Sequence, residues 1–391
     1  MKLTVSRARV RTMMLVVLVA LSGALAVAPS ASARKLANSN VAAASIDGTN
    51  VYWVAVTRSG LSSINRIDLA TNLVTTIFTT PNRSSYLTSV KAGGGRLAFD
   101  LVTFGRTRLT TTIKVAAADG SGLADLVTNQ IDGANDCGQV NGLLDVSETG
   151  EVFATAVTRT RTKITCAGAA DADNSTVTGY PLAAAAHLVY QKGGPINDKA
   201  LFESLVFNGQ ISNGNLLMVS PRSAIAVDVA TGTQAQYVPQ IAKANFIRGS
   251  IDASGRVLLS ELKAKAKRVK LKKKKGKKQK YKIIVKGHSK LMYYEAKLNP
   301  AVGKSLFDSK QDVGVAEFCG TRIALATGIL NEYGFVAQTE EIDTNGTSLR
   351  ALLPSEEFLT DSFHDCDSTG VVLSGFNFKT AKSELQLVPF S

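Results

Sequence analysis

A dense run of basic side chains is the most distinctive chemical feature of this sequence. Between Lys263 and Lys282 there are 13 lysine and arginine residues and no acidic residue. Such a segment releases counterions when it meets a polyanion, so it predicts binding that ignores sequence and weakens with salt. The alternative is a solvated loop without a dedicated partner. The residues expected to form this anion-binding patch are Lys267, Arg268, Lys270, Lys272, Lys273, Lys274, Lys275, Lys277, Lys278, Lys280 and Lys282.

Motifs of known catalytic centres are absent. The sequence has no Gly-x-Ser-x-Gly nucleophile elbow, no phosphate-binding loop and no His-Glu-x-x-His zinc motif. The histidines His187, His288 and His364 do not have the paired spacing of zinc ligands. His364 lies in the cluster Phe363–Asp367, but that cluster coincides with a repeated turn, which is the favoured interpretation. We therefore assign no catalytic residue, no metal site and no cofactor from the sequence.

The four cysteines, Cys137, Cys166, Cys319 and Cys366, are an even number. In an exported chain an even number suggests disulfides, here two, for which three pairings exist. We expect Cys137–Cys166 and Cys319–Cys366, because each pair closes a loop within one or two repeats. Four buried free thiols are the alternative if the chain is not exported.

The first 33 residues have the features of a secretory signal peptide. A basic start that includes Arg7 leads into the apolar run Met13–Ala28, and Ala31 and Ala33 form the small-x-small pattern of a cleavage site. The apolar run is short for a membrane span, which needs about 20 residues. We expect cleavage after Ala33, no transmembrane span in the mature chain, and a secreted, surface-associated or, with an outer membrane present, periplasmic location.

The rest of the chain repeats one unit. A turn rich in Gly, Asp, Ser and Thr runs into a short apolar strand at intervals of 41 to 66 residues, the length of three or four short strands. One such sheet cannot bury its own faces, whereas sheets packed radially cover one another. The pattern predicts an all-β β-propeller with seven blades, six being the alternative. The alternative to a propeller is an open pair of β-sandwiches or two half-size β domains. The strands begin near Val51, Leu97, Val152, Leu216, Val257, Ile323 and Val371.

Two of these segments resemble the repeats of known propeller families. Ile251–Val257 resembles the repeat of TolB-type (WD40-like) propellers, and Val227–Gly232 resembles the turn of surface-layer (YVTN-like) propeller repeats. The resemblance covers most of the mature chain, although no copy has the full Pro-Asp-Gly motif. It implies the propeller fold and a bias toward binding or scaffolding, and it transfers no catalytic residue.

Residues 34–391 are expected to form one propeller domain, with a polybasic loop inserted at 263–282. The last repeat, which begins near Cys366, has only two clear strands. We therefore expect Val41–Ser45 to complete the last blade and close the ring. Leu182–Gln191 is the only stretch with a helical pattern.

Together these features predict a secreted, non-enzymatic and monomeric propeller that acts as a binding or scaffolding module. Its expected partner is a protein or an anionic cell-surface polymer, not a specific nucleic acid, because Tyr281 is the only aromatic residue of the basic run. The alternative is a propeller hydrolase or lyase that acts on an extracellular saccharide. In that case Asp100, Asp145 or Glu261 are candidates for carboxylates at the channel mouth.

Overall fold

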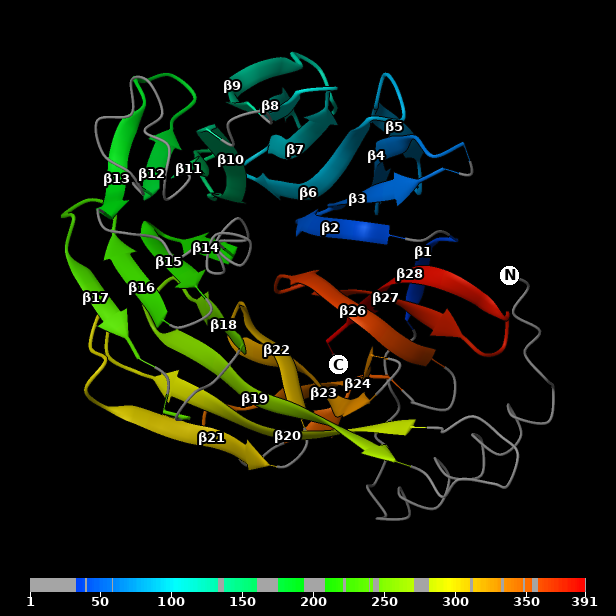
Figure 1. The fold of residues 1–391 in the computed structure, drawn as a ribbon, viewed down its shortest axis with the longest axis vertical. Coiled ribbons are helices and arrows are strands. Elements are labelled where there is room, and N and C mark those ends of the chain that lie inside the picture. Colours follow the sequence, from blue (N-terminus) through cyan, green and yellow to red (C-terminus); the bar gives the residue numbers. More distant parts are fainter. Residues whose placement is uncertain are drawn as a thin grey trace. The chain divides into compact units, whose positions relative to one another are not determined.

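Strands and turns make up the whole of the chain that the structure describes, and no helix occurs in it (Figure 1). No helix of the described residues is therefore long and apolar enough to cross a membrane. The helical pattern noted at 182–191 was wrong, because this stretch is irregular up to the strand that starts at His187. The computed structural model describes residues 33–38, 41–57, 59–132, 137–159, 175–192, 208–220, 223–238, 240–241, 246–270, 281–309, 312–331, 334–346, 349–353 and 358–390.

Within residues 31–391 the described strands form five antiparallel sheets arranged in a ring (Figure 1). We call the centre of this ring the channel. Three of these sheets have four strands each. The first contains β2 (Val41–Asp47), β3 (Asn50–Val56), β4 (Ser62–Asp68) and β5 (Val74–Thr79). The second contains β14 (Asn208–Ser212), β15 (Asn215–Ser220), β16 (Ser223–Asp228) and β17 (Gln234–Tyr237). The third contains β18 (Phe246–Ile251), β19 (Val257–Lys270), β20 (Tyr281–Tyr294) and β21 (Gly303–Ser309).

The other two sheets have eight strands each. One runs in chain order through β6 (Ser85–Gly93), β7 (Arg96–Phe104), β8 (Arg108–Ala117), β9 (Ala124–Asp132), β10 (Cys137–Val146), β11 (Val152–Arg159), β12 (Ser175–Tyr180) and β13 (His187–Lys192). The other joins both ends of the described chain. It contains β1 (Arg34–Ala37), β22 (Asp312–Cys319), β23 (Arg322–Asn331), β24 (Gly334–Ile342), β25 (Arg350–Ala351), β26 (Phe358–Cys366), β27 (Gly370–Asn377) and β28 (Lys382–Pro389).

The β-propeller is thus confirmed, but five sheets replace the seven blades, or six, that the sequence predicts. The difference arises at two junctions, where consecutive groups of strands pair with each other. β9 pairs with β10 through only two residue pairs, and β24 pairs with β26 through a single pair, Ala337 with Thr360. A turn pattern in the sequence gives no sign of such edge-to-edge pairing.

The hydrophobic core is divided into layers that lie between neighbouring sheets. Leu144 and Phe153 of one sheet pack on Leu216 and Met218 of the next. Leu217 and Tyr237 continue the pattern against Val257 and Tyr294 of the following sheet. Successive side chains of a strand point to opposite faces of its sheet. Every sheet therefore contributes to two layers of the core, and none can bury both of its faces without its neighbours.

The N-terminal strand closes the ring by pairing with the last strand. β1 pairs with β28, Lys35 opposite Gln386, and Leu36 is buried among residues of the first and last sheets. The closing strand is therefore Arg34–Ala37 and not Val41–Ser45, which belongs to β2 at the start of the first sheet. The sequence argument missed a four-residue strand that contributes only one buried apolar side chain.

The basic run is more regular than the expected inserted loop. β19 continues to Lys270 and β20 starts at Tyr281, and the two strands pair without a break from Val257–Tyr294 to Lys270–Tyr281. The β-branched residues Val269, Ile283, Ile284 and Val285 favour strand formation, and repulsion between solvated charges is weak. The run therefore extends a hairpin, and residues 271–280 lie outside the described residues.

The buried carboxylate Glu384 ties the closing strand to the ring. It accepts hydrogen bonds from Lys35 (2.9 Å), Thr380 (2.8 Å), Asn377 (2.9 Å) and Gln386 (3.1 Å). Burial raises the pKa of Glu384, but these donors outweigh burial and hold the pKa at about 2. A depressed pKa stabilises the fold above the unfolded value of 4.5, and this contribution is lost as pH falls toward 2.

We predict that Glu384→Gln lowers the free energy of unfolding at neutral pH by about 2 kcal/mol, because a charged acceptor is lost. Urea denaturation at several pH values measures the effect. The difference from the unaltered protein should disappear as pH approaches 2. The exposed Glu295→Gln is the control, and an equal loss in both variants, or a loss independent of pH, would contradict the assignment.

Candidate functional site

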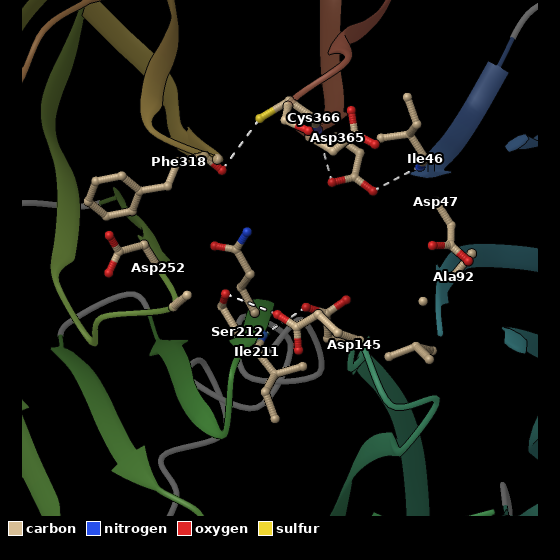
Figure 2. Close-up of a pocket in the computed structure, with 18 of the residues that line it drawn as sticks. Ile46, Asp47, Ala92, Asp145, Ile211, Ser212, Asp252, Phe318, Asp365 and Cys366 are labelled. Carbon is tan, nitrogen blue, oxygen red and sulfur yellow. Dashed lines mark hydrogen bonds between the residues drawn. The ribbon is translucent and has the colours of Figure 1, made fainter. Parts of the chain in front are cut away.

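A pocket of about 410 Å³ opens at one end of the central channel (Figure 2). The innermost strands β2, β6, β10, β14, β18, β22 and β26 all contribute their last residues, or the turns that follow, to its wall. None of the lining residues is Lys, Arg or His, and six carry carboxylates: Asp47, Asp145, Glu148, Asp252, Asp365 and Asp367. The mouth is therefore strongly acidic, although the whole chain has a formal charge of +14.

Tight turns bring these strand ends together. The turn between β6 and β7 contains Gly94 at φ +56°, in the left-handed region that favours glycine. A Cβ on Gly94 would lie 2.4 Å from the amide nitrogen of Gly150, in the turn between β10 and β11. Glycine here permits two neighbouring turns to meet backbone to backbone at the pocket rim.

Seven side chains occupy one equivalent position on the seven innermost strands. Each lies opposite the second or third residue of the strand that follows, as Ser45 lies opposite Tyr52 and Glu317 opposite Ala324. We call this set the channel ring. Its members are Ser45, Lys91, Asp145, Gln210, Ser250, Glu317 and Asp365.

Five members of the channel ring link one innermost strand to the next. Each accepts a hydrogen bond from the backbone N–H that follows the ring position on the next strand. The five bonds are Ala92 N to Ser45 Oγ (3.2 Å), Ile211 N to Asp145 Oδ2 (2.8 Å), Ile251 N to Gln210 Oε1 (3.1 Å), Phe318 N to Ser250 Oγ (2.9 Å) and Ile46 N to Asp365 Oδ2 (3.2 Å). Figure 2 shows the last of these across the pocket wall.

Lys91 and Glu317 are the two exceptions. A protonated lysine has no acceptor, and its Nζ lies 3.8 Å from Asp145 Oδ1 instead. Asp100 on β7 supplies the missing acceptor at that junction, 3.1 Å from Leu143 N. Among the described residues, the Glu317 carboxyl has no hydrogen-bond partner, and the side chain is partly exposed. Glu317 does not itself line the pocket, but it directly precedes Phe318, which does.

Burial and neighbouring charges shift the pKa values of this group. Burial, with a smaller effect of the Asp365 charge, raises the pKa of Glu317 to about 7, although Lys91 and Arg248 oppose the shift. Burial also raises the pKa of Asp145 to about 6, against the opposing charge of Lys91. Burial lowers the pKa of Lys91, but Asp365, Asp145 and Glu317 together reverse that effect and raise it. Lys91 therefore carries its charge among three carboxyls.

The candidates from the sequence are distributed unevenly. Asp145 is a channel-ring residue at the pocket wall, as expected for a channel-mouth carboxylate. Asp100 does not line the pocket, and its carboxylate accepts a hydrogen bond from Leu143 N (3.1 Å). Glu261 is fully buried away from the pocket, where it accepts from Gln240 N (2.9 Å) and Ile241 N (2.6 Å). Its role is structural.

The cluster Phe363–Asp367 is divided among several contacts. Asp365 belongs to the channel ring, Cys366 forms a disulfide, and His364 Nε2 lies 2.8 Å from Ser374 Oγ. Burial lowers the pKa of His364 to about 4, so the imidazole is neutral at pH 7. Among the described residues, no three His, Cys, Asp or Glu side chains are grouped to hold a metal ion.

The disulfide Cys319–Cys366 confirms one of the two expected pairings. The Cys166 residue and the Cys137 side chain lie outside the described residues, so their pairing stays a prediction. Lys267, Arg268, Lys270 and Lys282 of the anion-binding patch lie on β19 and β20, and the patch residues from Lys272 to Lys280 fall outside the described part.

Glu317, Lys91 and Gln210 were not singled out from the sequence. A signal was present, because every channel-ring residue precedes the strand start expected from the sequence by six or seven positions. That column contains Ser, Lys, Asp, Gln, Ser, Glu and Asp. An alignment of the repeats on their turns would have shown one polar column beside apolar ones.

No protein-family model matches the chain, and no curated protein matches its sequence. Solved structures match it in fold. The propeller domain of the trilobed protease from Pyrococcus furiosus is 11% identical with a TM-score of 0.56, over 90% of this chain and 96% of that one. An oligogalacturonate lyase in complex with manganese is 8% identical with a TM-score of 0.52, over 93% and 94%.

The acylaminoacyl peptidase of Pyrococcus horikoshii is 12% identical with a TM-score of 0.55, over 91% of this chain and 51% of the peptidase. The chain therefore spans about half the length of that enzyme. At such identities these matches show the β-propeller fold and do not assign an activity. They support the fold implied by the resemblance to TolB-type repeats, but not membership of the TolB-type or WD40 families.

We predict that Ser250→Ala lowers the free energy of unfolding by about 1 kcal/mol, because the Phe318 N–H then loses its buried acceptor. Urea denaturation measures the loss. Ser254→Ala is the matched control, since Ser254 is exposed in the turn after β18. If both variants keep the stability of the unaltered protein, the bonds of the channel ring do not stabilise the fold.

Proposed function

We propose that the channel mouth is the active site of a propeller hydrolase or lyase that acts on a saccharide, with Glu317 as the proton donor. The observation that carries this proposal is the state of Glu317. It is the one carboxyl of the channel ring without a hydrogen-bond partner among the described residues, and its pKa is raised to about 7. A carboxyl of this kind is protonated near neutral pH and can transfer that proton.

The chemistry of both reaction classes requires such a group. In both reactions the oxygen of the departing sugar must receive a proton as its bond to carbon breaks. In hydrolysis water then adds to that carbon and loses a proton to a base, and in elimination a base removes the proton of the neighbouring carbon so that a double bond forms. Protonated Glu317 would donate the proton that the departing oxygen receives. Asp365, held by Ser45 Oγ (2.7 Å) and by the Ile46 and Cys366 amides, would stay fixed as the neighbouring charge.

Other groups of the pocket are suited to binding hydroxyl groups. Asp145, Gln210 and Ser212 present oxygen and amide groups along the wall, and Phe318 offers an apolar surface. The similarity in fold to an oligogalacturonate lyase supports a saccharide substrate, as an analogy of fold only. The acidic mouth favours a neutral or amino-bearing saccharide over an oligogalacturonate.

A second candidate function is attachment to anionic surface polymers through the basic run. The favouring observation is that the paired strands β19 and β20 extend this run as a hairpin, to Lys270 on one strand and from Tyr281 on the other. The pairing of the two strands would bring their basic positions together for a polyanion. This function is compatible with an enzyme whose substrate lies in the same polymer layer.

We also propose that the two eight-stranded sheets each combine two blades, which would give seven. The four-strand groups β6–β9 and β10–β13 share only two residue pairs. The groups around β22–β25 and β26–β28 with β1 share one pair. The seven positions of the channel ring, one per innermost strand, support this count.

Export of the chain and removal of residues 1–33 belong to the same proposal. The disulfide Cys319–Cys366 is typical of oxidising compartments. The closing strand β1 starts at Arg34, directly after the expected cleavage site. Cleavage there would remove the whole leader and keep every residue that closes the ring.

We predict that purified mature protein depolymerises a saccharide from a panel of neutral, amino and uronate polymers, and that Glu317→Gln lowers kcat by about 10²- to 10⁴-fold, the usual contribution of a general acid. The rate should fall as pH rises through 7, because Glu317 then loses its proton. Reducing ends and unsaturated products, measured separately, distinguish hydrolysis from elimination.

Glu295→Gln is the control. Unchanged turnover in Glu317→Gln would overturn the assignment of the proton donor, and binding without turnover would leave a binding module.

For the hairpin we predict salt-sensitive retention on heparin-like polymer and anionic liposomes. Because Ala266 pairs with Val285, residues 267–284 can be replaced by an Asn-Gly turn without a register shift. This variant removes the whole anion-binding patch and should lose retention at low salt. A hairpin of full length with glutamine at the patch positions is the matched control for charge, and its full retention would exclude an electrostatic mechanism.

A further inference from the structure

The junction between β22 and β26 is built differently from its neighbours around the channel. At five junctions a channel-ring side chain accepts the N–H of the next innermost strand, and at the junction after β6 Asp100 replaces Lys91. Glu317 makes no such bond to β26. The Cys366 N–H, which occupies the corresponding position, is bound within its own strand by Asp365 Oδ1 (3.0 Å).

The disulfide lies at this junction and nowhere else among the described strands. It joins the last residue of β22, Cys319, to the last residue of β26, Cys366, with their Cα atoms 5.3 Å apart. The Cys366 sulfur also lies 3.7 Å from the Phe318 carbonyl oxygen, as Figure 2 shows. A covalent link therefore holds the two strands where a hydrogen bond holds them elsewhere.

The same link fixes two carboxyls. Glu317 is two residues before Cys319, and Asp365 is directly before Cys366. Both half-cystines are buried in a hydrophobic cluster with Val371 and Leu373. With two strands joined in this way, the backbone positions of Glu317 and Asp365 are held next to each other, and the cluster covers the side of the junction on which the half-cystines lie.

We propose that Cys319 and Cys366 are positioning residues: their disulfide takes over the role of the missing hydrogen bond and so leaves the Glu317 carboxyl free, close to Asp365, to exchange protons with a ligand. A catalytic role for Glu317 rests on the proposed function. The effect of the disulfide on the pKa of Glu317 does not, because that pKa is a property of the protein without a ligand. Among charged groups, Lys91, Asp145, Arg248 and Asp365 from β6, β10, β18 and β26 act on Glu317.

The test is the pKa of Glu317, measured by carbon NMR of protein with labelled glutamate carboxyls and assigned with Glu317→Gln. In a Cys319→Ser/Cys366→Ser double variant the strands can separate and water can enter, so the pKa should fall toward 4.5 by about one unit or more. Ser250→Ala is the matched control, because it removes the bond that holds β22 on its other side and leaves the disulfide intact. Its Glu317 should titrate close to the value in the unaltered protein.

Two further arms keep the outcome decisive. If the serine variant does not fold, as judged by near-ultraviolet circular dichroism, Cys319→Ala/Cys366→Val fills the same space without a covalent link and is titrated instead. An unchanged Glu317 pKa in a folded variant without the disulfide overturns the proposal, and so does an equal fall in Ser250→Ala. A fall confined to the disulfide variants supports it, whether or not the protein turns over a saccharide, so failure of the proposed function is detected separately.

Discussion

The structure depends on how the inner edges of its sheets are satisfied. Each group of strands begins with a strand whose inner edge faces the channel and has no neighbouring strand to pair with along most of its length. Unpaired backbone N–H groups are costly when they are buried and invite unwanted pairing when they are exposed. The channel ring solves this problem with side chains, since acceptors from five of the seven inner strands each bind one N–H of the next. Ser45, Asp145, Gln210, Ser250 and Asp365 do so directly.

This solution brings polar and charged groups into the middle of an otherwise apolar fold, and it sets the chemistry of the channel. Where the channel-ring residue accepts an N–H of the next strand, its role is structural. Lys91 and Glu317 accept no such bond. At Lys91 the strands are held by Asp100 of β7, and at Glu317 they are held by the disulfide Cys319–Cys366. Lys91 then keeps three neighbouring carboxyls from repelling one another, and Glu317 is left with a pKa near that of a useful proton donor.

The distribution of charge follows the same division. The formal charge of +14 describes the basic hairpin and the N-terminal segment, and says little about the channel mouth, whose lining contains carboxylates and no basic residue. A polyanion attracted to the hairpin would be repelled at the mouth, whereas a neutral or amino-bearing chain would not. Attachment and ligand binding would thus be carried out by separate surfaces with opposite charge.

Local patterns in the sequence determined the elements, and contacts between distant repeats determined the site. Alternating apolar residues and turn glycines were enough to predict an all-β propeller, and nearness in the chain was enough to pair Cys319 with Cys366. The sequence did not reveal that Arg34–Ala37 closes the ring, that two pairs of strand groups join edge to edge, or that Lys91 and Glu317 share one position with Asp145. Strand formation depends on neighbours a few residues away, but a ring contact such as Ser45 with Asp365 joins residues 320 positions apart. Which polar side chain meets which N–H is fixed only when the repeats close into a ring, because register between strands, and not composition, decides it.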